Sequence, residues 1–136
     1  MAIVGFNFTK ILVEKKKEMK GKVSINNSAG IKDIEKTELS LGKAKQPGLR
    51  IKFEYKSSYD PEIASILLEG EVLDLEDEKK IEEMLKEWNA KKKMPDDKVS
   101  PIINSILTRC NIEALILSKE MALPPPVPLP KVAFKK

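Results

Sequence analysis

Apolar and polar residues alternate along the first half of the chain, a pattern typical of half-buried strands. Between 3 and 18 the alternation changes phase near Thr9 and Lys10, which predicts one long strand with a bulge. The alternation is cleanest over 49–55, and after a turn at 57–61 it returns over 63–75. These segments predict the strands of an antiparallel sheet with one buried face.

The stretch 23–41 leaves two interpretations open. Val23 and Ile25 alternate before the turn-forming residues 26–30, and an apolar rhythm resumes at Ile31. This pattern fits two strands around a turn, or one strand that a bulge interrupts. Residues 42–48 contain Gly42, Pro47 and Gly48, which predict a loop. The sheet is therefore expected to have four or five strands.

After Glu76 the apolar period changes from two to about 3.6 residues, which predicts a short helix with Trp88 on its apolar face. A longer helix is predicted to begin at Pro101, with Ser100 as its N-cap. It is predicted to end at Leu123, because the prolines that follow remove backbone donors. Its apolar residues recur at steps of three and four in a wide stripe, which near the start of the helix contains Ile102, Ile103, Ile106 and Leu107.

The order of these elements predicts one α+β domain over 1–136. An antiparallel sheet of four or five strands fills 1–75, the short and the long helix fill 76–123, and a proline-rich extended segment, here called the strap, fills 124–136. The strap also carries Val127 and Leu129. We therefore expect it to pack on the chain's own sheet, rather than to remain a free polyproline ligand for another protein.

The wide apolar stripe of the long helix has two interpretations. A helix that lies on the chain's own sheet accounts for part of it, and a second copy of the chain accounts for the rest. We expect both, with subunits held together through Ile102, Ile103, Ile106 and Leu107. The protein is then a dimer, or a tetramer built from dimers.

Composition argues against catalysis. The chain has no histidine and one cysteine, Cys110, which lies on the apolar stripe, so the commonest general base and metal ligand is absent and no disulfide can form within the chain. We expect no enzyme activity, no metal and no cofactor. No apolar run is long enough to span a membrane and the N-terminus lacks a secretory pattern, so the cytoplasm is the expected location.

The net charge of +4 comes almost wholly from lysine, whereas nucleic-acid readers favour arginine. Phe53 and Tyr55 alternate with Lys52 and Lys56, and such aromatic residues could stack bases. Because Leu49 shares the face of the two aromatic residues, we expect this face to pack under the helices instead. A nucleic-acid module therefore stays only as an alternative.

The last 35 or so residues resemble the SecB family of cytoplasmic chaperones, which hold unfolded polypeptides. The resemblance lies in the run Pro101-Ile-Ile-Asn-Ser-Ile-Leu-Thr-Arg-Cys-Asn-Ile, in Leu123 with Pro124, and in Pro130 six residues later. Val132 and Phe134 follow near the place where the family continues with valine and phenylalanine. The rest of the chain resembles the family only in the order of sheet, long helix and proline-containing segment.

The resemblance implies a SecB-like fold and a non-enzymatic chaperone that binds unfolded polypeptides in apolar grooves between sheet and helix. It would place these residues near the groove: Phe53, Tyr55, Tyr59, Trp88, Leu123, Val127, Leu129 and Phe134. Bacterial members are acidic and continue into a second helix and a tail that meets the translocation motor, whereas this chain is basic and ends at Lys136. Delivery to that motor is therefore not implied. A structural or adaptor subunit of a larger complex is a further alternative.

Overall fold

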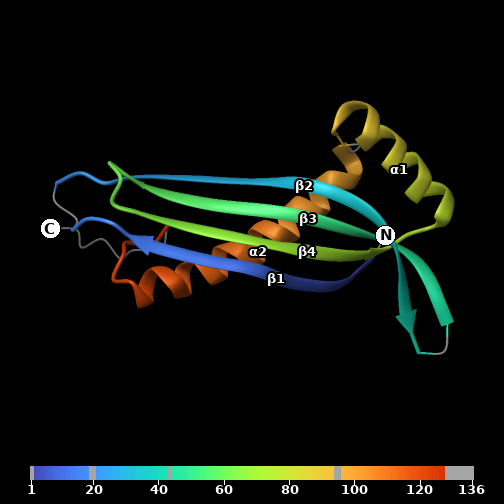
Figure 1. Cartoon of the computed structure of the whole chain (residues 1–136), viewed down its shortest axis with the longest axis horizontal. Coiled ribbons are helices and arrows are strands. Elements are labelled where there is room, and N and C mark those ends of the chain that lie inside the picture. The colour runs from blue at the N-terminus through green and yellow to red at the C-terminus, as the bar shows by residue number, and fades with distance from the viewer. Residues whose placement is uncertain (1, 19–20, 43, 94–95, 128–136) are drawn as a thin grey trace, which may run out of the picture.

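The strands form one antiparallel sheet in the order β1-β4-β3-β2 (Figure 1). The computed structural model describes residues 2–18, 21–42, 44–93 and 96–127. Its strands are β1 (Ala2–Lys15), β2 (Ser24–Leu41), β3 (Ala44–Asp60) and β4 (Ala64–Leu75), and its helices are α1 (Glu78–Lys91) and α2 (Asp96–Glu120). The predicted α+β class and element order are confirmed, with four strands in the described part of the chain.

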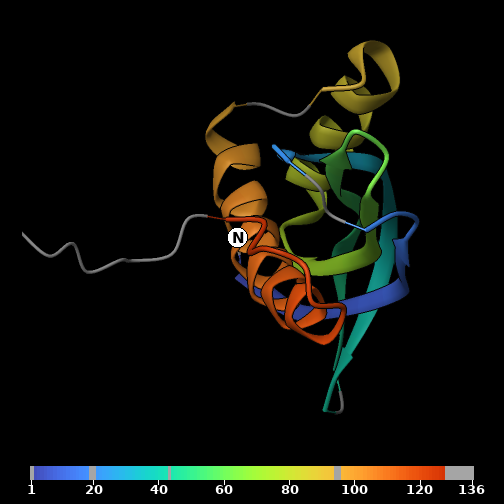
Figure 2. The ribbon, with the colours of Figure 1, turned by 90° about the vertical axis from the view of Figure 1, so that its left-hand side faces the viewer.

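Both helices cover the same face of the sheet. Helix α2 crosses it obliquely and packs on β2, β3 and β4, while α1 packs on β2 and β3 at one end (Figures 1 and 2). Every second residue of β3 from Leu49 to Tyr59 is buried, and the same alternation continues along β4. These inward positions form the core together with Ile81, Ile102 and Ile106 of the helices. In the described part of the chain no helix lies on the other face of the sheet, here called the open face.

The predicted bulge in the first strand is confirmed. The pairing of β1 with β4 shifts register between Phe8 and Lys10, and a second shift lies between Ile3 and Gly5. In β2 a shift lies between Ile31 and Asp33, so the stretch 23–41 is one strand with a bulge, and not two strands around a turn. Asn27, inside the expected turn, pairs with Ser57.

The predicted loop at 42–48 is wrong over most of its length. Strand β3 already begins at Ala44, and the chain reverses around Gly42, whose φ of +68° suits glycine. Because β3 pairs with β4 only from Gly48 onward, the tip of the β2–β3 hairpin extends beyond the other two strands (Figure 1). Proline at position 47 is tolerated because that part of β3 has a partner on one side only.

The predicted start of the long helix is also wrong. Helix α2 begins at Asp96, so Ser100 is not its N-cap and Pro101 lies inside the helix. Proline near the N-terminus of a helix removes a single hydrogen bond. Asp97 in the first turn favours this earlier start, because negative charge stabilises the N-terminal end of a helix.

Candidate functional site

The chain leaves α2 through a defined C-terminal cap. The N–H of Ala122 donates to the carbonyl of Lys119 over 3.2 Å, and the N–H of Leu123 donates to the carbonyl of Ser118 over 2.8 Å. These two bonds and the left-handed φ of 52° at Ala122 make a Schellman motif. The motif turns the chain back over the sheet, buries Leu123, and sends the strap across the ends of β2 and β3.

Two side chains of the sheet hold the described part of the strap, residues 124–127. The hydroxyl of Tyr59 donates to the carbonyl of Pro124 over 2.6 Å, and the Nδ2 amide of Asn27 donates to the carbonyl of Pro126 over 2.7 Å. These are alternate carbonyls of the strap, whose backbone bends at Pro126 and Val127. Pro126 is buried, and because proline has no N–H, its burial leaves no backbone donor without a partner.

A polar network beneath the strap positions the two donors. Ser57, fully buried on β3, donates to Oδ1 of its cross-strand neighbour Asn27 over 2.6 Å. This bond leaves the Asn27 amide free to face the strap. Tyr55 donates to Oδ1 of Asn111 on α2 over 3.1 Å, and Ser57 lies 3.4 Å from the Tyr55 hydroxyl. The network therefore joins α2, β3, β2 and the strap.

Burial keeps the tyrosines of this network protonated. Loss of hydration raises the pKa of Tyr59 to about 12, and it raises the pKa of Tyr55 as well. Both hydroxyls are therefore donors throughout the neutral range. The Tyr59–Asn27 site, as we call this pair of donors, binds neutral carbonyl oxygens, because it contains no charged group.

The structure places the expected groove residues in three different situations. Phe53, Tyr55 and Tyr59 are fully buried under α2 and the strap, and Trp88 and Leu123 are nearly so. Val127 is half-buried on the strap, while Leu129 and Phe134 lie outside the described residues. The five buried members of this set therefore line no open groove in the described part of the chain, since the chain itself fills the space around them.

The structure also separates Trp88 from the other expected groove residues. Trp88 belongs to α1, which follows the end of β4 and lies at the sheet end where Leu75 pairs with Gly48. Tyr59 lies at the opposite end of β3, where it pairs with Ile25. One groove cannot contain both residues without running the length of the sheet. Of the expected groove residues that the structure describes, Tyr59, Leu123 and Val127 lie at the strap.

A second surface is apolar and exposed. Among the described residues, six large apolar side chains are exposed by 37% to 53%, four on β1 and two on α2: Ile3, Val4, Ile11, Leu12, Ile112 and Ile116. The two elements run side by side, because Arg109 lies 4.7 Å over the ring of Phe6 and Lys15 donates to the carbonyl of Met121. A hollow of about 390 Å³ lies between them, lined by Ile3, Phe6, Asn104, Ser105, Thr108 and Arg109. We call this region the β1–α2 surface.

The expected subunit contacts on α2 lie mostly in the core. Ile102 and Ile106 are fully buried against the chain's own sheet, so neither side chain has surface left for a second copy. Ile103 and Leu107 are half-buried on the flank of the helix. The outward apolar residues are instead Ile112 and Ile116, one and two turns further along α2. The sequence pattern places Ile116 in the stripe but does not mark it as the exposed edge, and it leaves Ile112 out of the stripe.

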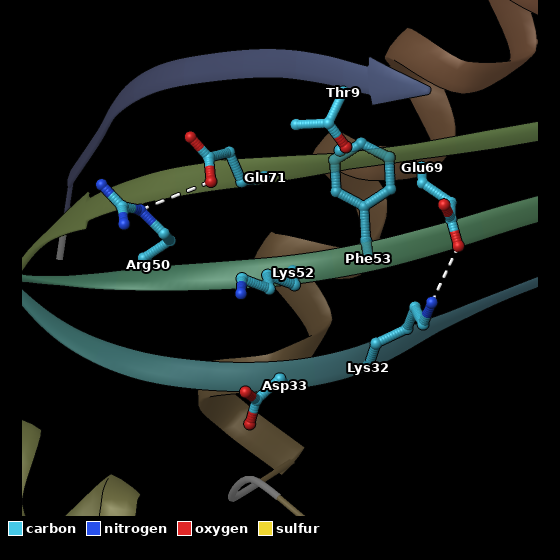
Figure 3. Close-up of a pocket in the computed structure, with 9 residues that line it drawn as sticks. Thr9, Lys32, Asp33, Arg50, Lys52, Phe53, Glu69 and Glu71 are labelled. Carbon is cyan, nitrogen blue, oxygen red and sulfur yellow. Dashed lines mark hydrogen bonds and ion pairs between the residues drawn. The ribbon is translucent and has the colours of Figure 1, made fainter. Parts of the chain in front are cut away.

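The open face of the sheet is the third surface considered, and it contains a polar hollow of about 590 Å³ (Figure 3). Cations and carboxylates alternate across its strands, so each basic group has an acidic neighbour. Lys32 lies 2.7 Å from Glu69, Arg50 lies 3.4 Å from Glu71, and Lys52 lies 3.1 Å from Glu35. The ion pair raises the pKa of Lys32 and lowers the pKa of Glu69. Such exposed pairs neutralise this face and stabilise the fold only slightly.

Sequence analysis missed the two polar residues that matter most at the strap. Asn27 was assigned to a turn, and Ser57 was assigned to the next turn, although both lie in strands. The signal available for Ser57 was the alternation of β3, which continues through positions 55, 57 and 59. A serine at an inward position predicts a buried hydrogen bond.

Within the described ranges, no three or more His, Cys, Asp or Glu side chains are grouped so that they could hold a metal ion. Neither α1 nor the described length of α2 is long and apolar enough to cross a membrane.

No protein-family model matches the sequence, and no curated protein matches it either. Among solved structures, the chain is similar to the Mycobacterium tuberculosis SecB-like chaperone Rv1957, solved in complex with a ChAD peptide from the Rv1956 HigA1 antitoxin. The TM-score is 0.58 at 11% sequence identity, and the match covers 99% of this chain and 92% of the other. At an identity this low, the match shows that the backbone folds are similar and nothing further. The chain therefore has a SecB-like fold.

Proposed function

We propose that the protein is a non-enzymatic chaperone that holds unfolded, extended polypeptides and works as a homo-oligomer in the cytoplasm. The observation that carries this proposal is the SecB-like fold, which extends over 99% of the chain and which a peptide-bound chaperone shares. Holding a polypeptide requires binding alone, so the proposal needs no nucleotide, metal or catalytic group.

The strap supports this function directly. The sheet holds its described part by hydrogen bonds from Tyr59 and Asn27 to backbone carbonyls. Backbone carbonyls occur in every polypeptide, so this mode of recognition depends little on the bound sequence. A chaperone for unfolded chains must bind many different sequences, and low sequence selectivity meets that need.

The β1–α2 surface is the basis for proposing an oligomer. Strand β1 is an edge of the sheet, and its exposed residues Ile3, Val4, Ile11 and Leu12 are apolar. Soluble proteins usually protect an edge strand with charges or cover it. A second copy related by a two-fold axis would cover β1 and α2 with the same apolar surface, which is self-complementary. We propose a dimer, or a tetramer built from dimers.

The structure offers less support for a nucleic-acid module. Phe53 and Tyr55 are fully buried under α2, while Lys52 and Lys56 are exposed on the open face. Aromatic rings and cations therefore lie on opposite sides of the sheet and cannot bind the same strand of nucleic acid. Lys52 is also paired with Glu35. A purely structural subunit would have the same apolar surface, so the aggregation assay is needed to distinguish it from a chaperone.

The test is suppression of aggregation without nucleotide. A reduced client that aggregates in minutes is followed by light scattering with increasing amounts of the protein. We expect suppression at near-stoichiometric ratios that is nearly the same at 50 and 300 mM salt, because apolar contacts and hydrogen bonds are weakly screened. Filter binding to RNA and DNA at the same two salt concentrations is the control, since counterion release makes nucleic-acid binding fall steeply with salt. Undiminished aggregation at a tenfold molar excess would show that the protein is not a holdase.

A further inference from the structure

The strap occupies its site as a bound peptide would. Its described part crosses the end of the sheet, bends at Pro126 and Val127, and is held through the carbonyls of Pro124 and Pro126 rather than through ion pairs. The site lies far from the strap in sequence, since Asn27 and Pro126 are 99 positions apart and Tyr59 and Pro124 are 65 apart. The strap is thus a segment from the C-terminal part of the same chain that occupies the site as a tethered ligand would.

We propose that the Tyr59–Asn27 site is a binding site for extended, proline-containing polypeptide, and that strap residues 124–127 occupy it in cis and compete with the client. This inference rests on the proposed holdase function and assigns to it both a binding site and an internal competitor. Displacement of the strap would open the site and uncover Tyr59 and Leu123, which the resemblance to SecB proteins placed at a groove.

The chemistry of the site favours proline in the bound segment. Tyr59 and Asn27 both donate, and the Oδ1 atom of Asn27 already accepts from Ser57. A bound peptide N–H that pointed into the site would have to share the remaining lone pairs of the Tyr59 and Asn27 oxygens, so a segment with fewer N–H groups to satisfy suits the site better. Proline has no N–H, so a segment with prolines at these positions presents carbonyls only. The three consecutive prolines of the strap meet this requirement.

The strap is attached in a way that permits exchange. Its described part is held by two hydrogen bonds, the burial of Pro126 and the anchoring of Leu123 at the end of α2. Pro125 is exposed and Val127 is half-buried. Because the strap is tethered, its effective concentration at the site is in the millimolar range. A client must therefore bind tightly, or contain several segments that fit the site, to displace it.

The test uses the full chain and a fluorescent peptide with the sequence of residues 121–127, Met-Ala-Leu-Pro-Pro-Pro-Val. The variant Leu123→Asp forces a charge into an apolar contact and should release the strap without touching the donors. By fluorescence anisotropy, we expect this variant to bind the peptide at least about tenfold more tightly than the parent, because the cis competitor is removed. Ser40→Asp adds the same charge at an exposed position near the tip of the β2–β3 hairpin, at the other end of the sheet from the strap, and should bind like the parent.

A second change tests the donors themselves. Tyr59→Phe, added to Leu123→Asp, removes one hydroxyl and should weaken peptide binding by about five- to tenfold, the usual effect of one lost hydrogen bond. A peptide with alanine in place of the three prolines should bind the Leu123→Asp variant less tightly than the parent peptide does. Circular dichroism checks that each variant is folded, and Leu123→Ala replaces Leu123→Asp if the charge unfolds the chain.

The outcomes separate this proposal from the proposed function. If Leu123→Asp and Leu123→Ala bind the peptide no better than the parent, or if Tyr59→Phe has no effect, the strap is structural and the proposal fails. Client aggregation is measured on the same variants. If the parent suppresses aggregation but the peptide result is negative, the holdase function is supported and the client binds at another site. If the protein binds the peptide but does not suppress aggregation, the peptide site is supported and the holdase function is not.

Discussion

At the scale of single residues, burial in the largely apolar core on the helix side of the sheet changes the titration of the polar side chains that lie there. The Cys110 thiol lies at the centre of the α2 interface, where it is fully buried, and burial raises its pKa from 9.0 to about 12. Tyr59 shows the same effect, from 10.0 to about 12. In both groups the low polarity of the surroundings disfavours the charged form. Cys110 is therefore a packing residue, and not a nucleophile.

This burial predicts a loss of stability at alkaline pH. Because the folded pKa of Cys110 is raised above its unfolded value, its contribution to stability is complete below about pH 9 and is lost as pH rises through about 12. In urea unfolding, we expect the free energy of unfolding to fall progressively above about pH 9, and to fall less steeply in Cys110→Ala. Parallel pH profiles for parent and variant would contradict the assignment.

At the scale of elements, the pairing of β1 with β4 depends on the glycine at position 70. Gly70 on β4 lies opposite Phe8 of β1 and opposite Phe53 of β3, so three strands meet around it. The ring of Phe53 lies close over it and packs against Phe6 and Phe8, with ring centroids 5.1 and 6.2 Å away. A Cβ atom at this position would meet the carbonyl oxygen of Asn7 and the Phe53 ring. The sheet therefore requires glycine here.

Gly70→Ala is expected to destabilise the protein by about 1 to 3 kcal/mol, the usual range for overpacking a filled core. The matched control is Gly30→Ala on β2, where an added Cβ would have no heavy atom within 4 Å and φ is not positive. The control should change the free energy of unfolding by less than about 0.5 kcal/mol. Chemical denaturation of both variants measures the difference. Equal stability of the two would mean that β1 does not pack this closely on β4.

The whole molecule exposes more apolar surface along β1 and α2 than a monomer is expected to leave in water. Ile112 and Ile116 are about half-exposed, one turn apart on α2, and lie beside the apolar edge strand. Since their side chains contribute little to the core, changes there test assembly and leave folding intact.

Ile112→Asp with Ile116→Asp should convert the oligomer to a monomer, because two charges would be forced into an apolar contact between subunits. Light scattering after size-exclusion chromatography measures the mass, and circular dichroism should show an unchanged fold. Ser28→Asp with Ser58→Asp adds the same charge on the open face and should leave the oligomer intact. A parent that is monomeric across micromolar concentrations would refute the proposed assembly.

Local patterns in the sequence determined the class of the fold. Alternation over β3 and β4 and the change of period after Glu76 correctly predicted strands and helices, and the phase change near Thr9 predicted a real bulge. These features depend on which side of the backbone faces the core, and side-chain periodicity records that directly. The burial of Phe53 and Tyr55 followed from the same pattern.

Only the tertiary structure decided where elements end and which distant residues meet. Pairing with β3 extended β2 through the expected turn at 26–30, because cross-strand hydrogen bonds override weak local turn preferences. The contact of Asn27 with Pro126 joins residues 99 positions apart, and no local period encodes it. The stripe on α2 likewise contains the buried Ile106 and the exposed Ile116. Which of them faces the sheet depends on how the helix lies on the strands, since the sequence records that both are apolar but not what covers them.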